Sequence, residues 1–550
     1  MNFRGNFLSS YTLIINKQSY ILVVTDMNYH RSVEDIKITK RDRLFLFVVV
    51  TVNLIIKVIP SRILELSNDE VYYWTYAMFP DWSHFDHPPM LGWVIQLFSL
   101  NLKFESELAI RAGALILSSA SIIILFNLVK RLYSRKAAYF SVVMYVSSIY
   151  FNIISGLFIL PDAPLIFFTL LALYYLLPSV TVNNPGRKDH FNILMFGFFA
   201  GLAFLSKYNS LFLWFGVGLY ILFRNRIWLK KPSLYLSLLV TLLLSVPVIY
   251  WNIKNEFISF TFHGDRVSLF TNPVNLSYFA TFNLGQFAYH NPVLFVIYAI
   301  ALYRMLRRKK QKISELNSLL LFLGLPLILV FTFFSLFRNT LPHWTGPAFT
   351  CLIILSSEYL AEIYNKKKRV LIRSLSAAAV IYILVLAIGT LQINTGIIGF
   401  KPDPKQVYPG ENDVTLDMYG WRQTGNKFAE FLIREGLSEK DRQHVAIVSN
   451  KWYPAAHLDY YVAHPLGIKL LAFGSIDRIH KYYWINKTRE LDATDRIYYV
   501  TDSRNYHGPE DFASYCSEII PKDTLTIERE GRIAKYVYIY SLVDFERDSY

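Results

Sequence analysis

The sequence predicts a mainly helical integral membrane protein with a small α/β domain at its C-terminal end. The chain has 550 residues, of which 53% are hydrophobic and only 18% are charged, whereas soluble domains are usually about a quarter charged. Its apolar residues form runs that are long enough to cross a bilayer, which takes roughly 20 residues each. From residue 394 onward the composition becomes mixed and polar.

About eleven segments qualify as membrane spans. They lie at 43–61, 109–129, 137–155, 162–178, 191–206, 210–224, 233–252, 287–303, 317–337, 344–361 and 371–393. The apolar stretch 88–100 is too short to span, and its Trp93 and polar flanks predict an interfacial helix. These segments divide the chain into an N-terminal segment, 1–42, a transmembrane domain, 43–393, and a soluble domain, 394–550.

The positive charge alternates between the intervals that separate the spans. Intervals such as 304–312 (RMLRRKKQK) and 366–369 (KKKR) are strongly basic, while the intervals between them are not. The positive-inside rule then places the N-terminus in the cytoplasm. The membrane expected to contain the chain is the inner membrane of the cell. The first polar loop, 62–108, and the C-terminal domain are expected outside. Orientation therefore accounts for the net charge of +15, and no nucleic-acid partner is expected.

The C-terminal region alternates between strand and helix patterns. HVAIVS (444–449), IKLLAF (468–473), RIYYVT (496–501) and KYVYIY (535–540) predict strands, and 425–437 and 453–463 predict helices. This alternation is typical of a small α/β domain.

Ionisable residues gather on the predicted outer side. Charged groups at membrane depth cost roughly 2.5–3.5 kcal/mol on insertion scales, so those that occur are paired, interfacial or functional. The set comprises Asp69, Glu70, Asp86 and His87 in the first outer loop, Asp162 at the start of a span, Lys207 at a turn, His263 and Arg266 in a later loop, and Arg338 and His343 before another span.

Several of these residues also have simpler structural interpretations. Asn68 and Asp69 could cap a helix that starts at Glu70. Asp162 fits the first turn of a helix, where the dipole stabilises an acid. Lys207 could extend along the interface without contacting a substrate. The tyrosines and tryptophans of the first loop could form an aromatic belt at the membrane surface.

The combination of motifs resembles a known family. DEVYYWTYAMFPDWSHFDHPPM (69–90), LPDAPLIFF (160–168) and FLSKYNS (204–210) are similar to the bacterial integral-membrane glycosyltransferases of the GT-C fold. Within that fold, the pattern resembles protein O-mannosyltransferase-like enzymes and aminoarabinose–lipid A transferases, grouped as family 39-like glycosyltransferases. The resemblance is strong over 43–360 and weaker in the tail, where MYGWRQTG (418–425) still fits.

This resemblance implies transfer of a sugar from a polyprenyl-phosphate donor to an acceptor at the outer face of the membrane. The acceptor class, whether lipid A, a protein or a cell-surface glycan, stays open. Asp69 matches the catalytic acid of the first loop, and Asp162 matches a second acid. Asp86 and His87 match an acidic-plus-basic pair in which some members have lysine. A neutral histidine binds phosphate less well than lysine and metals better.

The chemistry of such a transfer gives each residue type an expected role. Asp69 would remove the proton of the acceptor hydroxyl or amine, and a carboxylate facing the anomeric carbon favours inversion. The departing lipid phosphate needs cations. Either a divalent metal (Mg, Mn or Zn) held by Asp86 and His263 or the side chains of Lys207 and Arg266 would supply them. The expected substrate-binding residues are Glu70, Tyr73, His87, Lys207, Arg266 and His343.

Two other functions fit a polytopic chain with an outer domain. A transporter or a flippase for lipid-linked sugars would bind near the midplane between related halves, and the sequence has neither feature. An assembly or sensor protein would bind a partner through the tail and would have no use for the acids at 69 and 162.

Overall fold

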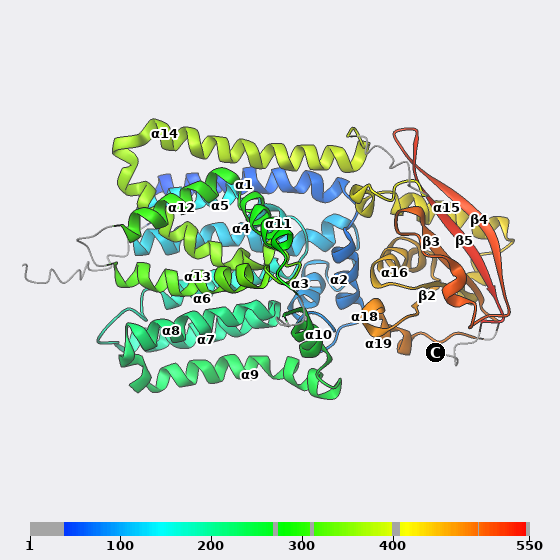
Figure 1. Cartoon of the computed structure of the whole chain (residues 1–550), viewed down its shortest axis with the longest axis horizontal. Helices are drawn as coiled ribbons and strands as arrows, with labels where there is room; N and C mark the ends of the chain where they lie inside the picture. The colour runs from blue at the N-terminus through cyan, green and yellow to red at the C-terminus, as the bar shows by residue number, and fades with distance from the viewer. Residues whose placement is uncertain (1–37, 268–272, 308–312, 399–407, 493, 546–550) are drawn as a thin grey trace, which may run out of the picture. The chain divides into compact units, whose positions relative to one another are not determined.

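The structure is a computed structural model that describes residues 38–267, 273–307, 313–398, 408–492 and 494–545. The segment predicted as 1–42 therefore lies almost wholly outside the described residues. Ile38–Tyr550 forms one compact unit, in which long helices lie side by side and a sheet packs with short helices (Figure 1). The α-helices of the first part are α1 (Lys40–Ile63), α2 (Asn68–Met78), α3 (Met90–Phe98), α4 (Glu107–Leu132), α5 (Arg135–Ser147), α6 (Asp162–Leu176), α7 (Arg187–Ser206), α8 (Leu211–Phe223), α9 (Pro232–Lys254), α10 (Ile258–Val267), α11 (Leu276–Tyr289), α12 (Pro292–Leu306), α13 (Glu315–Phe334) and α14 (Gly346–Thr395).

The mainly helical membrane architecture is confirmed, although the number of spans stays a prediction. Among the described residues, six helical segments are long and apolar enough to cross a membrane, and three shorter apolar ones accompany them. Outward-facing side chains such as Phe47 and Leu243, 68% and 60% exposed, suit a lipid environment. Two predicted spans, 344–361 and 371–393, both lie in α14, whose helical geometry is broken at Lys367.

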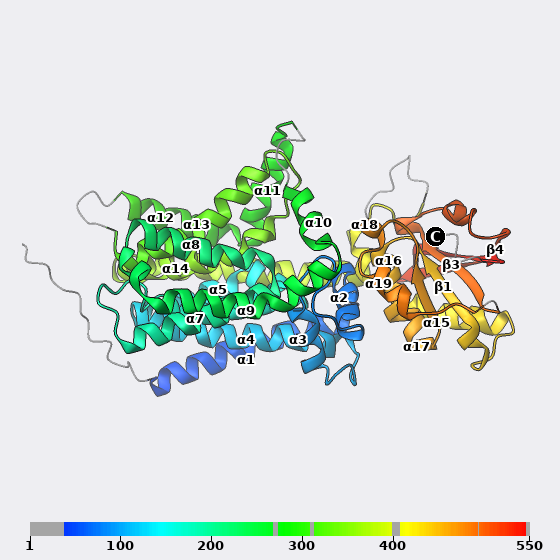
Figure 2. The same cartoon turned by 90° about the horizontal axis from the view of Figure 1, so that it is seen from below.

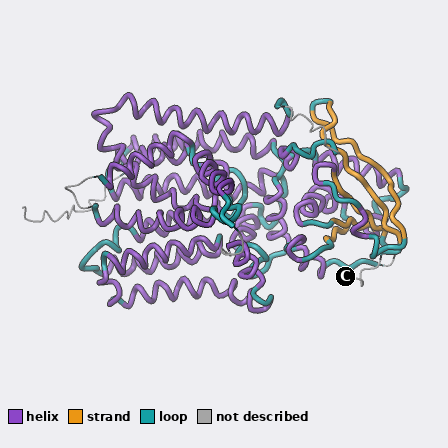
Figure 3. The backbone as a smooth tube through the Cα atoms, viewed as in Figure 1, coloured by secondary structure: helices purple, strands orange, loops and turns teal. Residues whose placement is uncertain are grey.

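The predicted α/β region is also confirmed. Its α-helices are α15 (Trp421–Arg434), α16 (Trp452–Leu458), α17 (His464–Leu466), α18 (Ile476–Ile479) and α19 (Tyr482–Ile485). Its strands are β1 (Val445–Ser449), β2 (Lys469–Ala472), β3 (Arg496–Asp502), β4 (Glu518–Arg529) and β5 (Arg532–Val543), drawn in orange in Figure 3. They follow the order β2-β1-β3-β5-β4, parallel in the β2-β1-β3 part and antiparallel beyond it.

The edge strand β4 is missing from the sequence prediction. Its segment EIIPKDTLTIER contains Pro521, which lacks a donor for the sheet and argues against a central strand. At the edge this proline is tolerated, and the register shifts between Pro521 and Asp523. Because of this proline, the sequence of β4 does not predict a strand, and only its position at the edge of the sheet explains why a strand forms there.

The helix α2 begins earlier than the capping alternative predicts. Its N-cap is Ser67, and Asn68 already belongs to the helix. The Glu70 carboxylate accepts hydrogen bonds from the backbone N–H of Ser67, at 3.0 Å, and from its hydroxyl, at 3.1 Å. This arrangement is a capping box, in which the third residue of the helix reaches back to the cap.

Glu70 also forms a buried ion pair with Arg111 of α4. The Arg111 Nη2 and Glu70 Oε2 atoms are 2.7 Å apart, and neither side chain is exposed. Arg111 donates further hydrogen bonds to the carbonyl oxygens of Ser61, Leu64 and Glu65, where α1 ends. Glu70 Oε1 in turn accepts the backbone N–H of Ile159, three residues before α6, at 3.1 Å. One ion pair thus joins α1, α2, α4 and the start of α6.

The sheet region packs directly onto α2 and the loop before it. Trp74 of α2 is fully buried and meets Tyr460 edge to face, with the ring centroids 5.3 Å apart. Glu65 accepts the backbone N–H groups of Trp421 and Arg422 at the start of α15, at 2.8 and 3.0 Å. Figure 2 shows α16 and α18 beside α2 from a second direction. The first polar loop and the tail therefore share one hydrophobic core.

Removal of one partner of the Glu70–Arg111 pair should destabilise the whole unit. Glu70→Ala leaves the guanidinium buried without a counter-charge, and we expect a loss of about 3–5 kcal/mol in the free energy of unfolding. Denaturant titration in detergent measures it. Glu315→Ala is the matched control, because Glu315 pairs with Arg224 at the surface and should cost about 1 kcal/mol or less. Equal losses in the two variants would contradict the proposed importance of the buried pair.

Candidate functional site

A cavity of about 510 Å³ lies where the helices meet the sheet region. Its polar lining comes from α2, from the loop after α2 and from the start of α6, and also from the turn after α7, from α10, from the turn before α14 and from the sheet region. Its apolar lining includes Leu160, Phe212 and Phe331 from the helical part. The complete lining comprises Asp69, Tyr73, Asp86, His87, Leu160, Pro161, Asp162, Lys207, Tyr208, Asn209, Phe212, His263, Gly264, Phe331, Leu341, His343, Trp344, Trp452 and His480.

Eight of the predicted site residues line the cavity: Asp69, Tyr73, Asp86, His87, Asp162, Lys207, His263 and His343. Glu70 is fully buried in its ion pair with Arg111, so its carboxylate supports the fold and does not face the cavity. The reason is helical geometry, because consecutive residues point about 100° apart. Arg266 lies in α10, but its side chain falls outside the described residues.

Asp69 faces the cavity with an accessible carboxylate. Loss of water around the group and the nearby charges of Asp86 and Glu70 raise its pKa to about 6, although Lys207 opposes the shift. A carboxylate of this kind exchanges its proton near neutral pH, which is the range that suits a general base.

Asp86 differs from Asp69, because its pKa is lowered and its carboxylate stays ionised. Its Oδ1 accepts hydrogen bonds from the hydroxyls of Tyr72, at 3.0 Å, and of Tyr76. Burial alone would raise its pKa, but the neighbouring His87 and His480 and the bond from Tyr76 keep it below the usual value. The two acids of the first loop thus differ in protonation behaviour.

Asp162 is buried at the first position of α6 and carries two partners. Lys207 Nζ lies 2.7 Å from its Oδ2, and the Tyr150 hydroxyl donates to its Oδ1 at 2.7 Å. Tyr150 belongs to a π-helix, Tyr150–Ile154, an element that is frequent at functional sites. A methyl group at Gly346 would overlap the Tyr150 ring, so the absence of a side chain there makes room for this tyrosine.

His87 is half-buried at the cavity wall. Its Nδ1 is inaccessible and has no hydrogen-bond partner within the described part of the chain. Burial lowers the pKa of His87 to about 3 despite the attraction of Asp86. The imidazole is therefore neutral at physiological pH. Among the described residues of the lining, Lys207 is a cation, and it pairs with Asp162.

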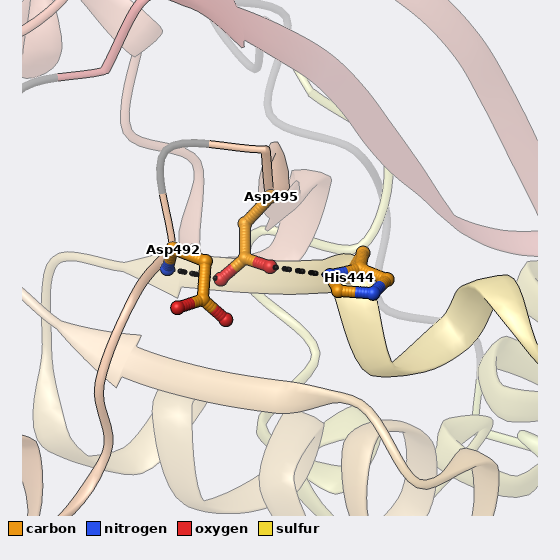
Figure 4. Close-up of side chains that lie close together, drawn as sticks. All are labelled: His444, Asp492 and Asp495. Atoms are coloured by element: carbon orange, nitrogen blue, oxygen red, sulfur yellow. Dashed lines mark hydrogen bonds and ion pairs between the residues drawn. The ribbon is translucent and has the colours of Figure 1, made fainter.

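The predicted metal ligands Asp86 and His263 meet in a different way. His263 Nε2 lies 2.7 Å from the backbone carbonyl oxygen of Asp86, so this ring nitrogen contacts the backbone of the acid. In the described ranges, the group of three side chains close enough to hold a metal is His444, Asp492 and Asp495, in the sheet region (Figure 4). Lys469 Nζ lies 3.3 Å from Asp492 and 2.9 Å from Asp495, so this group already has its own counter-charge.

Tyr208, Trp452 and His480 are among the lining residues that the sequence analysis did not single out. Tyr208 follows Lys207 directly and meets the His263 ring edge to face at 5.3 Å. Trp452 and His480 come from the sheet region and reach the cavity only through its packing on α2. The sequence signal for the latter two is weak, since a tryptophan and a histidine in a folded domain are ordinary.

A second cavity of about 600 Å³ adjoins the first. Its lining includes Val274, Tyr278 and Phe337, and it shares Leu341 and Trp344 with the site cavity. Arg338, predicted on the outer side, also lies in its wall. A second compartment of mixed apolar and polar lining therefore borders the site cavity.

Comparisons with known proteins relate the chain to membrane glycosyltransferases. Residues 86–251 match the family of dolichyl-phosphate-mannose-protein mannosyltransferases. The chain is 23% identical over 288 residues to the lipid A galacturonosyltransferase RgtD of Rhizobium johnstonii, a match that covers 52% of this chain and 59% of that protein. The chain thus spans less than two thirds of this relative.

Solved structures agree with this relationship. The apo crystal structure of ArnT from Cupriavidus metallidurans aligns with a TM-score of 0.60 at 13% identity, covering 91% of this chain and 98% of that one. The same protein bound to undecaprenyl phosphate aligns with a TM-score of 0.58 at 14% identity, covering 90% and 98%. The fold is thus that of ArnT, and the resemblance to GT-C membrane glycosyltransferases is confirmed.

The raised pKa of Asp69 predicts a pH-dependent gain of stability on its replacement. The folded state binds this proton more tightly than the unfolded chain, so Asp69 makes folding less favourable as the pH rises from about 4 to above 6. Asp69→Asn should therefore unfold at a higher temperature than the wild type at about pH 7.5, and the gain should shrink toward pH 4. Thermal unfolding at several pH values measures it. Asp81→Asn, in the same loop but outside the cavity, should show no such gain; a gain independent of pH would contradict the assignment.

Proposed function

We propose that this chain is a membrane glycosyltransferase that moves a sugar from a polyprenyl-phosphate donor to an acceptor outside the cytoplasm. The observation that carries the proposal is the cavity itself, in which Asp69, Asp86, Asp162 and Lys207 meet beside an apolar wall. A lipid-linked sugar has the matching composition: an apolar chain, an anionic phosphate and a polar ring.

The apolar residues give the lipid part of the donor a place to lie. Phe212, Phe331 and Leu341 line the helical side of the cavity, and the adjoining cavity continues beyond Leu341 and Trp344. A polyprenyl chain in the bilayer can therefore bring its phosphate to Lys207 without leaving the apolar phase. Asp162 takes one of the three donors of Lys207, which leaves two for the phosphate oxygens.

The proposed transfer is a single displacement. The acceptor oxygen or nitrogen attacks the anomeric carbon, and its proton passes to the Asp69 carboxylate. The bond between the anomeric carbon and the phosphate oxygen breaks as the new bond forms, and the lipid phosphate leaves with both bonding electrons. Lys207 balances the negative charge that develops on it. This course inverts the configuration of the sugar.

Asp162 and Asp86 have supporting roles in this scheme. Asp162 holds Lys207 at the level where the phosphate arrives, and Tyr150 fixes the other carboxylate oxygen. Asp86 stays ionised and is fixed by two tyrosines, which leaves its outer oxygen free to accept hydrogen bonds from sugar hydroxyls. His87, Tyr73 and His343 complete the wall.

The acceptor we favour is lipid A. Support comes from the relative named as a lipid A galacturonosyltransferase. We also propose that the chain lies in the inner membrane, with 1–42 cytoplasmic, 43–393 as the transmembrane domain and 394–550 outside. The distribution of Lys and Arg between the intervals supports this orientation.

Replacement of Asp69 should abolish transfer without loss of the fold. Asp69→Asn removes the proton acceptor, and we expect the rate to fall by about 10²–10⁴-fold. Purified protein is incubated with a panel of undecaprenyl-phosphate sugars and lipid A, and consumption of each donor is followed. Asp81→Asn is the control and should retain activity. If the wild type consumed no donor while a known enzyme of this class did so, the proposal would fail and transport would become the stronger alternative.

Replacement of Lys207 tests the phosphate clamp. Lys207→Gln keeps a hydrogen-bonding side chain but loses the charge, and we expect about 100-fold slower transfer or worse. Lys487→Gln, in the sheet region away from the cavity, is the matched control.

Treatment with EDTA tests the prediction that Asp86 and His263 hold a metal. If activity is lost in EDTA and restored by Mg²⁺, Mn²⁺ or Zn²⁺, a metal shares the role of Lys207.

A further inference from the structure

Two residues of the sheet region line the cavity but have no role in the proposed transfer. Trp452 is the first residue of α16, and His480 follows the end of α18. Their ring planes are almost parallel, 8° apart, and the centroids are separated by 5.3 Å. The His480 ring, only 6% exposed, is therefore stacked on the Trp452 ring, and both residues reach the cavity on the side that the tail provides.

The backbone at His480 has a conformation that side chains normally avoid. Its φ is 50° and its ψ is −127°, a combination that is essentially restricted to glycine. Strain of this kind costs of order 1–3 kcal/mol and persists only where the surroundings enforce it, commonly at functional sites. A glycine at position 480 would remove the strain, so the presence of histidine needs an explanation from its ring.

The surroundings hold this ring in place from several directions. The Tyr72 ring meets the His480 ring edge to face, with centroids 5.8 Å apart, and the Phe85 ring lies 4.9 Å from it. The next residue, Lys481, donates its backbone N–H to the Tyr72 hydroxyl at 3.3 Å, and its Nζ lies 2.9 Å from His84 Nδ1. The strained turn is therefore clamped to the first loop.

The same contacts connect His480 with the polar part of the cavity. The Tyr72 hydroxyl that accepts from Lys481 also donates to Asp86. The tail thus places an aromatic surface next to a fixed carboxylate. An apolar face beside a hydrogen-bond acceptor is complementary to a pyranose ring, whose C–H groups form a face and whose hydroxyls lie at the edge.

We infer that Trp452 and His480 form a binding wall for a pyranose ring of one of the two substrates. This inference rests on the proposed function and extends it, because it assigns part of the sugar site to the tail. The opposite wall, with Phe212 and Phe331, belongs to the membrane helices and suits the lipid chain. The ring bound by the tail wall is either the sugar of the donor or a sugar of the acceptor.

The experiment compares binding of undecaprenyl phosphate with and without its sugar, using full-length protein in detergent. The variants are Trp452→Ala and His480→Gly. We expect each to bind the sugar-bearing lipid about tenfold more weakly or worse, which corresponds to about 1.4 kcal/mol, while affinity for bare undecaprenyl phosphate stays unchanged. A merely structural role would weaken both.

The glycine variant separates function from folding. Glycine suits the backbone at 480, but the variant also loses a buried ring, so its melting temperature is measured beside its binding. A loss of affinity confined to the sugar-bearing lipid separates a binding role from a structural one. Glu530→Gly is the matched control: Glu530 also has a positive φ, 51°, but lies in the turn between β4 and β5. Its side chain is exposed and does not line the cavity, so Glu530→Gly should bind both lipids normally.

The outcomes identify the source of the ring. Weaker donor binding assigns the wall to the donor sugar. Unchanged donor binding with an increase of about tenfold in KM for lipid A assigns it to the acceptor. Normal donor binding and normal KM in both variants would overturn the inference and leave the proposed function intact. A wild type that neither binds nor consumes any sugar-bearing lipid would overturn the proposed function itself.

Discussion

The buried ion pair between Glu70 and Arg111 is the contact on which the rest of the structure depends. Arg111 binds the carbonyl oxygens at the end of α1, and Glu70 binds the start of α2 and the segment before α6. Both charges are fully enclosed, so each needs all of these partners to offset its loss of water. The pair therefore fixes the relative positions of Asp69, which precedes Glu70, and Asp162, which follows Ile159 by three residues.

The electrostatics of the cavity follow from that placement. Several carboxylates share a space with little water, and they cannot all be ionised at equal cost. Asp86 is stabilised by two tyrosine hydroxyls, and Asp162 by Lys207. Asp69 lies between them with the pKa nearest to neutrality. The fold thus separates one proton acceptor from two fixed charges, a division typical of sites that combine acid–base chemistry with charge stabilisation.

The tail and the membrane helices form a single unit rather than two linked bodies. Glu65 accepts a backbone hydrogen bond from the start of α15, and Trp74 packs on Tyr460. Lys481 Nζ lies within hydrogen-bond distance of His84 Nδ1. These contacts make the sheet region part of the cavity wall. A removal of the tail would therefore expose the core of α2 as well as the site, and point substitutions such as those at 452 and 480 report on its role more cleanly.

The sequence alone determined the features that depend on local composition. Apolar length predicts the helices of the membrane part, alternation predicts β1, β2, β3 and β5, and the acids of the first loop stand out because charge is costly beside membrane spans. Only the tertiary structure decided which acid faces the cavity. Asp69 and Glu70 are neighbours of the same charge, and the position of Arg111, 41 residues from Glu70, assigns one to the site and the other to the fold. The edge strand β4 and the wall made by Trp452 and His480 likewise depend on partners that are distant in the sequence, which no local pattern records.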